Sequence, residues 1–209
     1  MNAMRMADNP RTLPDLPPPF RVRWVAGDVM AAARQAAERG EEPGLLLIGE
    51  DEATCDLALA LAPDRPEAAC RVVLHLAMLA VADALAAVGP PLKEVVFASP
   101  DGLRLDGAKV GRVRLAMAEV AAPDEVPEWC VVGPEVRMML PPAAGEPGAM
   151  PEVTALHEEG FGDVGVVELA QSFARHFLYW MHRWTEEGSG PVLAHWRARL
   201  DPLTIEPVL

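Results

Sequence analysis

The feature that most constrains the fold is a long apolar segment in the first half of the chain. Residues 67–88 follow Pro66 and end at the Gly-Pro-Pro sequence of residues 89–91, which stops a helix firmly. His75 and Asp83 interrupt the apolar run, which argues against a membrane span. We therefore expect one long, buried or amphipathic helix around which the rest of the chain is organised.

The segments around this helix have the patterns of strands and shorter helices. Asp28 is expected to cap a helix that runs to Arg39 and stops at Gly40. Asp106-Gly107 between two alternating runs predicts a β-hairpin. Strands are expected where apolar residues alternate or form short runs, at residues 20–25, 45–48, 57–62, 95–97, 103–105, 109–117, 131–133 and 136–140.

The last third of the chain changes to a helical period. Apolar residues recur at steps of three and four from Val166 to Trp184, after Asp163 as a candidate cap. The glycines at 188 and 190 are expected to break that helix before a short one at 191–200. Residues 141–151, rich in Pro, Gly and Ala, are expected to form a loop. This order predicts an α/β (α+β) domain with a mixed sheet over residues 20–209, after a disordered or extended leader at 1–19.

Charge and cysteine content exclude several classes of function. The 209 residues contain 18 Lys and Arg against 31 Asp and Glu, a formal net charge of −13. Such a surface repels phosphate, so neither nucleic acid nor an anionic membrane is an expected partner. The cysteines, Cys55, Cys70 and Cys130, are too few and too widely spaced for a disulfide framework, and no His or Cys spacing suits a metal site. A cytoplasmic location is the expectation.

The central hairpin carries a resemblance to a known family. Residues 100–111, Pro-Asp-Gly-Leu-Arg-Leu-Asp-Gly-Ala-Lys-Val-Gly, are similar to the biotin protein ligase motif K-W-P-N-D-x3-D-G-x-K-(V/L)-x-G. The resemblance extends in order over about residues 20–200, through residues 43–50, the helix at 67–88, Val131-Val132-Gly133, the Thr-Ala-Leu-His-Glu-Glu-Gly of residues 154–160, and residues 192–197. The chain thus resembles the catalytic domain of the biotin/lipoate protein ligase family.

The resemblance implies an activity and a site. Members of this family bind biotin or lipoate and ATP, form an acyl-adenylate and transfer the acyl group to a lysine of an acceptor domain. Lys109 matches the family's catalytic lysine. The matching ligand-binding positions are Pro100, Asp101, Gly107, Gly111, Gly133 and Arg137. A small carboxylic acid and an acyl-carrier domain are the partners implied, and an oligomer is possible.

The sequence departs from the family where ATP would bind. The family's Gly- and Arg-rich loop is replaced by the acidic residues 50–56, and the lysine and tryptophan of K-W-P-N-D are Ala98 and Ser99. Repulsion between these carboxylates and a triphosphate would be large at close range. We therefore expect weak or lost ATP-dependent ligation, the profile of a pseudoenzyme candidate.

Two alternatives remain open at this stage. The chain could be an acyl (lipoyl or octanoyl) transferase that needs no ATP, with Cys130 the nearest candidate nucleophile, or a non-catalytic partner-binding scaffold. Basic groups near Lys109 would favour an enzyme. Strand alternation puts Arg112 and Arg114 on one face and Lys109 on the other, unless a bulge at Gly111 intervenes.

Overall fold

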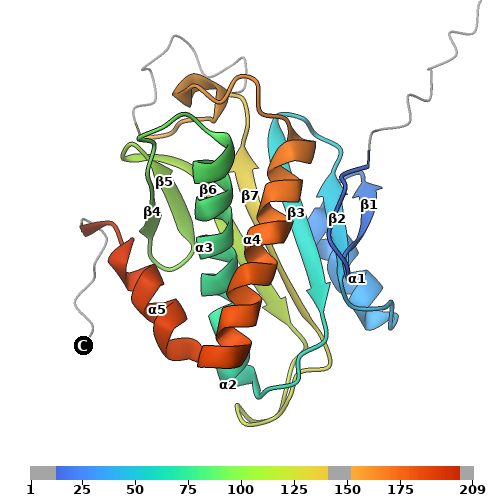
Figure 1. The fold of residues 1–209 in the computed structure, drawn as a ribbon. Coiled ribbons are helices and arrows are strands. Elements are labelled where there is room, and N and C mark those ends of the chain that lie inside the picture. Colours follow the sequence, from blue (N-terminus) through green and yellow to red (C-terminus); the bar gives the residue numbers. More distant parts are fainter. Residues whose placement is uncertain (1–12, 141–151, 203–209) are drawn as a thin grey trace, which may run out of the picture.

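One mixed β-sheet organises the molecule, as a computed structural model that describes residues 13–140 and 152–202 shows (Figure 1). Its seven strands lie in the order β1-β2-β3-β7-β6-β5-β4. β1 and β2 are parallel, and all other neighbours are antiparallel. The strands are β1 (Arg21–Val25), β2 (Leu45–Gly49), β3 (Thr54–Leu61), β4 (Val95–Ala98), β5 (Gly102–Leu105), β6 (Ala108–Met117) and β7 (Cys130–Arg137).

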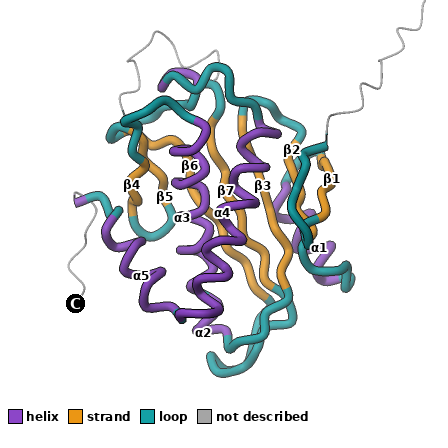
Figure 2. Tube along the Cα trace, viewed as in Figure 1, coloured by secondary structure: helices purple, strands orange, loops and turns teal. Residues whose placement is uncertain are grey.

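Helices cover the two faces of the sheet unequally (Figures 1 and 2). On one face α3 (Val72–Val88) and α4 (Val166–Glu187) lie side by side over the centre of the sheet, with α5 (Ser189–Ala198) beside them. The short α2 (Glu67–Cys70) leads into α3. On the other face, the part of the chain that the structure describes places one helix, α1 (Val29–Glu38), which packs against β2, β3 and β7. One face is therefore covered by a layer of helices, and the described residues cover only part of the other.

The long apolar helix is the centre of the core, as predicted. Eleven residues of α3 are buried, between the sheet and α4. The segment Glu67–Val88 is long and apolar enough to cross a membrane, but most of it is buried inside the fold. A mixed sheet with this helix packed on it confirms the predicted fold class.

The β1–α1–β2 unit also forms as predicted. The Asp28 carboxylate accepts a hydrogen bond from the Ala31 backbone N–H at 2.9 Å, so Asp28 caps α1. The helix ends at Glu38, with Arg39 as its C-cap just before Gly40, whose φ is +74°. This connection joins two parallel strands, and it brings the start of α1 to the same end of the sheet as the β2–β3 turn, where the Glu50 N–H donates to the Val25 carbonyl.

Three local predictions were wrong. The expected strands at 131–133 and 136–140 are one strand, β7, which pairs on both sides and therefore continues through Pro134. β3 begins at Thr54 instead of residue 57. Asp163 does not cap α4, which starts at Val166 with Gly165 at the N-cap position and no side-chain cap. The predicted loop at 141–151 and most of the predicted leader lie outside the described residues, but Leu16 packs against the core.

Candidate functional site

A patch of charged side chains occupies the open part of the sheet, on the same face as α1. It is made of alternate residues of three neighbouring strands, whose intervening residues face α3 and α4 in the main core. Asp56 on β3 and Glu135 on β7 are register partners, and Arg112 on β6 is the register partner of Glu135. The members of this patch are Asp56, Arg112, Arg114, Glu135 and Arg137.

A β-bulge adds Lys109 to this patch. The pairing of β5 with β6 slips between Leu103 and Arg104, so that Arg104 pairs with Lys109 while Leu103 pairs with Gly111. The extra residue lets both Val110 and Val113 face the core, which leaves Lys109 on the same face as Arg112. The bulge that would reverse the strand alternation near Gly111 is therefore present.

Lys109 and its neighbours surround a small hollow of about 140 Å³. Three cationic side chains and one carboxylate line it, so the lining has a formal positive charge in a strongly acidic chain. We call it the β6–β7 hollow. Its lining residues are Thr54, Lys109, Val110, Gly111, Arg112, Glu135 and Arg137.

Carboxylates already neutralise part of this positive charge. Arg112 donates from Nε to Glu135 Oε2 at 3.0 Å. Arg114 pairs with Asp56, on the far side of β7, and its Nε lies 3.5 Å from Glu135 Oε2. Burial raises the pKa of the Asp56 carboxyl to about 6, and the charges of Glu135 and Asp28 add to that effect, while Arg114 partly offsets it. The hollow thus lies at the edge of a network of ion pairs.

Arg137 also has a structural task. Its Nη1 donates to the carbonyls of Lys109 at 3.2 Å and Thr154 at 2.9 Å. Thr154 in turn donates its hydroxyl to Glu159 at 2.7 Å. These bonds fix the segment that follows residue 151 against β6, so Arg137 both lines the hollow and holds its wall.

The structure separates the remaining predicted ligand-binding residues from the hollow. Pro100 and Asp101 form the β4–β5 turn, where the Asp101 carbonyl accepts from the Val113 N–H at 2.8 Å. Gly107 closes the β5–β6 hairpin with φ +86°. None of these three lines the hollow. Their predicted ligand contacts therefore remain untested predictions.

The two strand glycines have packing reasons for their identity. A β-carbon at Gly133 would lie 1.8 Å from the Leu57 carbonyl oxygen, and one at Gly111 would lie 2.3 Å from the Glu135 carbonyl oxygen. Both positions are close approaches of neighbouring strands that a side chain would prevent. Gly111 lines the hollow and Gly133 does not.

Sequence reasoning missed Thr54, Asp56 and Glu135. The signal was available for the first two, because Thr54, Asp56 and Ala58 alternate with the apolar Cys55, Leu57 and Leu59. Beginning the strand at residue 57 concealed that pattern. The pairing of Glu135 with Arg112 depends on the register of β6 and β7, which the sequence does not display.

The β2–β3 turn beside the hollow is short and acidic. The Asp51 carboxylate accepts from the Ala53 N–H at 2.9 Å, and the Asp51 carbonyl accepts from the Thr54 N–H at 3.3 Å. Glu50, Asp51 and Glu52 occupy the turn, which contains no basic residue. The turn is held by its own hydrogen bonds and offers no cationic group to a polyphosphate.

Cys130 lies on the wrong face to act in this hollow. It is buried in the core on the α3–α4 side of the sheet. Burial raises the pKa of its thiol to about 12, so it stays protonated at neutral pH. The structure therefore gives the transferase alternative no nucleophile at Cys130.

These features define a class of protein: a mixed sheet with paired long helices on one face and a lysine-containing hollow on the other, built around a bulged hairpin. The model of the biotin/lipoate A/B protein ligase family matches residues 16–198 of this chain. The chain belongs to that family. A search of curated proteins finds no match.

Solved structures agree with this assignment. A biotin protein ligase-like protein of unknown function from Silicibacter sp. TM1040 is 32% identical, with a TM-score of 0.81 over 90% of this chain and 80% of that one. The apo biotin protein ligase of Aquifex aeolicus is 15% identical, with a TM-score of 0.69 over 87% and 78%. The biotin complex of the Leishmania major ligase is 13% identical, with a TM-score of 0.61 over 90% and 83%. The last two are similar in fold alone.

Proposed function

We propose that the protein binds a small carboxylic acid in the β6–β7 hollow and does not adenylate it efficiently. The observation that carries this proposal is the convergence of Lys109, Arg112 and Arg137 on one hollow. Cationic donors that share one pocket attract a carboxylate by charge and by hydrogen bonding. The bulge in β6 is what makes this convergence possible.

The size of the hollow favours a carboxylate group over a nucleotide. Ligand pockets for whole small molecules and cofactors usually enclose about 300–1,000 Å³. The hollow has about 140 Å³, enough for the charged end of an acid whose remainder extends over the open sheet. Lys109 is the residue best placed to bind the carboxylate, because its side chain is exposed at the hollow.

The electrostatics oppose a triphosphate. Arg112 and Arg114 are paired with Glu135 and Asp56. Bringing several phosphate charges to this network would require those pairs to break and would add repulsion from the acidic β2–β3 turn. This supports weak or lost ATP-dependent ligation.

Structural relatives support the choice of ligand. An Aquifex aeolicus ligase similar in fold has been solved with biotin and ATP, and a Leishmania major ligase with biotin. Biotin, lipoate and octanoate are therefore the acids to test first. An acyl-carrier domain as the partner and a cytoplasmic location are further parts of the proposal, and family membership supports the first of them.

Calorimetry on the purified full chain tests the proposal. Biotin, lipoate and octanoate are titrated alone and in the presence of ATP, and pyrophosphate release is measured in parallel. We expect one acid to bind with 1:1 stoichiometry, with no tightening by ATP and no pyrophosphate. Lys109→Ala should weaken that binding about tenfold, which corresponds to about 1.4 kcal/mol.

Arg175→Ala is the matched control. Arg175 is an exposed cation on α4, on the opposite face of the sheet, so its removal changes the net charge equally without touching the hollow. Equal weakening by both substitutions would mean that Lys109 acts only through net charge. Pyrophosphate release with an acid and ATP would instead establish an active ligase, and silence with every acid would refute carboxylate binding.

A further inference from the structure

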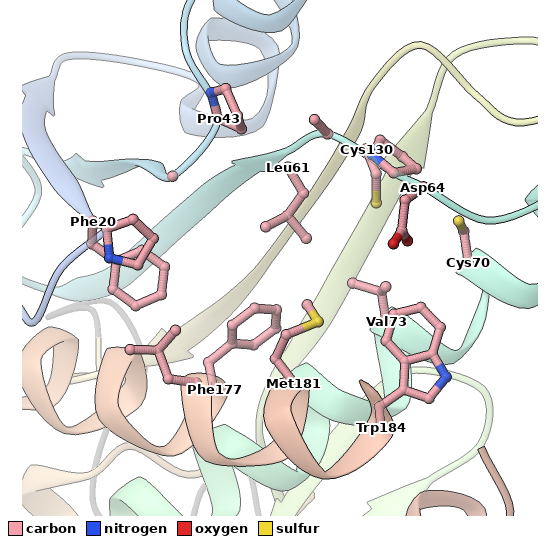
Figure 3. Close-up of a pocket in the computed structure, with 15 residues that line it drawn as sticks. Phe20, Pro43, Leu61, Asp64, Cys70, Val73, Cys130, Phe177, Met181 and Trp184 are labelled. Carbon is pink, nitrogen blue, oxygen red and sulfur yellow. The ribbon is translucent and has the colours of Figure 1, made fainter. Parts of the chain in front are cut away.

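An apolar hollow next to the core lies on the other side of the sheet, away from the β6–β7 hollow. It has a volume of about 350 Å³ and is bounded by the segment before β1, the end of β3, α2, α3 and α4 (Figure 3). We call it the α4 pocket. Its walls are mostly aliphatic and aromatic, with Phe20, Leu61, Val73, Phe177, Met181 and Trp184 among them.

This volume is large for a gap left by packing. Protein interiors are close-packed, and hollows larger than a water molecule are few in a domain. A cavity of about 150 Å³ in another protein is sufficient to bind benzene. The α4 pocket has more than twice that volume and reaches the surface, so a ligand can enter it.

One end of the α4 pocket is lined by a carboxylate. Among the described residues that line it, Asp64 is the only charged one. In Figure 3 Asp64 lies at the same end as Cys70 and Trp184, with Phe20 at the opposite end. The Asp64 side chain is 88% exposed and lies 3.7 Å from Arg65 Nε, a weak pair that leaves the carboxylate accessible.

Arg65 does not fill the pocket itself. Its guanidinium lies over the Trp184 ring, 4.6 Å from the ring centroid, and it is not among the lining residues. The thiols of Cys70 and Cys130 at this end are neutral, because burial raises the pKa of each. The charged group that lines this end of the pocket is therefore Asp64, and the Arg65 guanidinium lies next to it, outside the lining.

We propose that the α4 pocket binds an aliphatic amine, with its unbranched chain along Phe177 and Met181 and its ammonium group at Asp64. Apolar walls with one accessible carboxylate complement such a ligand in both shape and charge. An acid of the same chain length would be repelled, because its carboxylate would lie next to the carboxylate of Asp64. This site is separate from the β6–β7 hollow and does not depend on the function proposed for it.

Three probes of equal chain length test the proposal by calorimetry on the full chain: n-octylamine, n-octanol and octanoate. We expect octylamine to bind 1:1 and more tightly than octanol. Asp64→Asn should weaken octylamine at least fivefold and leave octanol unchanged. Because Asp64 is exposed, this substitution should not affect folding.

Two control variants separate this site from other effects. Asp163→Asn removes an exposed carboxylate near the start of α4, at a position that does not line the pocket, and should leave octylamine binding unchanged. Lys109→Ala should also leave it unchanged, even if that substitution abolishes binding of the acids. Octanol binding as tightly as octylamine, tighter binding of octanoate in this pocket, or no binding of any probe would each overturn the proposal.

Discussion

The Asp56 carboxyl should make the folded state less stable as the pH rises from about 4 to about 6. Its side chain is only 20% exposed, and its pKa is raised from 3.8 to about 6, mainly by burial. The folded protein therefore holds a proton on Asp56 at pH values where the unfolded chain has released it. The cost is absent below pH 4 and complete above pH 6.

The size of this effect follows from the change in pKa. A difference of about two pH units corresponds to about 3 kcal/mol of unfolding free energy. Asp56→Asn keeps the shape of the side chain and removes the titration. The variant also removes the pair with Arg114, whose effect is already contained in the pKa of Asp56.

Urea unfolding followed by circular dichroism at pH 4, 5, 6 and 7 measures this directly. The difference in unfolding free energy between the variant and the wild type should shift in favour of the variant by up to about 3 kcal/mol between pH 4 and pH 7. Taking the difference cancels the titration of groups that are not coupled to Asp56. A difference that stays constant with pH, or that shifts toward the wild type, would refute the reasoning.

Two further predictions concern packing. Asp83→Ala should lower the unfolding free energy by about 1–3 kcal/mol. Asp83 accepts hydrogen bonds from Trp180 Nε1 at 2.7 Å and Arg199 Nη2 at 2.8 Å, and both donors would lose this partner. An unchanged melting temperature would contradict this prediction. Gly133→Ala should destabilise the protein by about 3 kcal/mol through the clash with the Leu57 carbonyl. Gly162→Ala is its control, since a β-carbon there would meet nothing within 4 Å, and equal melting temperatures for the two variants would refute a close approach at Gly133.

The sequence alone determined most of the architecture. The apolar segment at 67–88 between prolines and glycine predicted a long helix, because packing such a helix in the core removes a large apolar surface from water. The Asp106-Gly107 turn between alternating strands specified the hairpin, and its lysine-containing motif led to the family that the comparison then showed. Local chemistry was sufficient at these places because each signal lies within a few residues.

Boundaries were less accessible to sequence reasoning. β7 continues through Pro134 because it has partners on both sides, so the loss of one N–H does not end the strand. Asp163 has the right chemistry for a cap but lies two residues before Gly165, the N-cap residue of α4. Such choices depend on neighbours that are distant in the sequence.

Tertiary structure decided which side chains meet in the site. A single extra residue in β6 moves Lys109 to the face of Arg112, and the register of β6 with β7 sets Glu135 against both arginines. The α4 pocket likewise joins segments from residue 19 to residue 184. Side chains alternate between the two faces of a sheet with a period of two, so one inserted residue moves the side chains on one side of it to the opposite face. Whether a strand contains such a residue depends on its pairing with neighbouring strands, which the linear sequence does not specify.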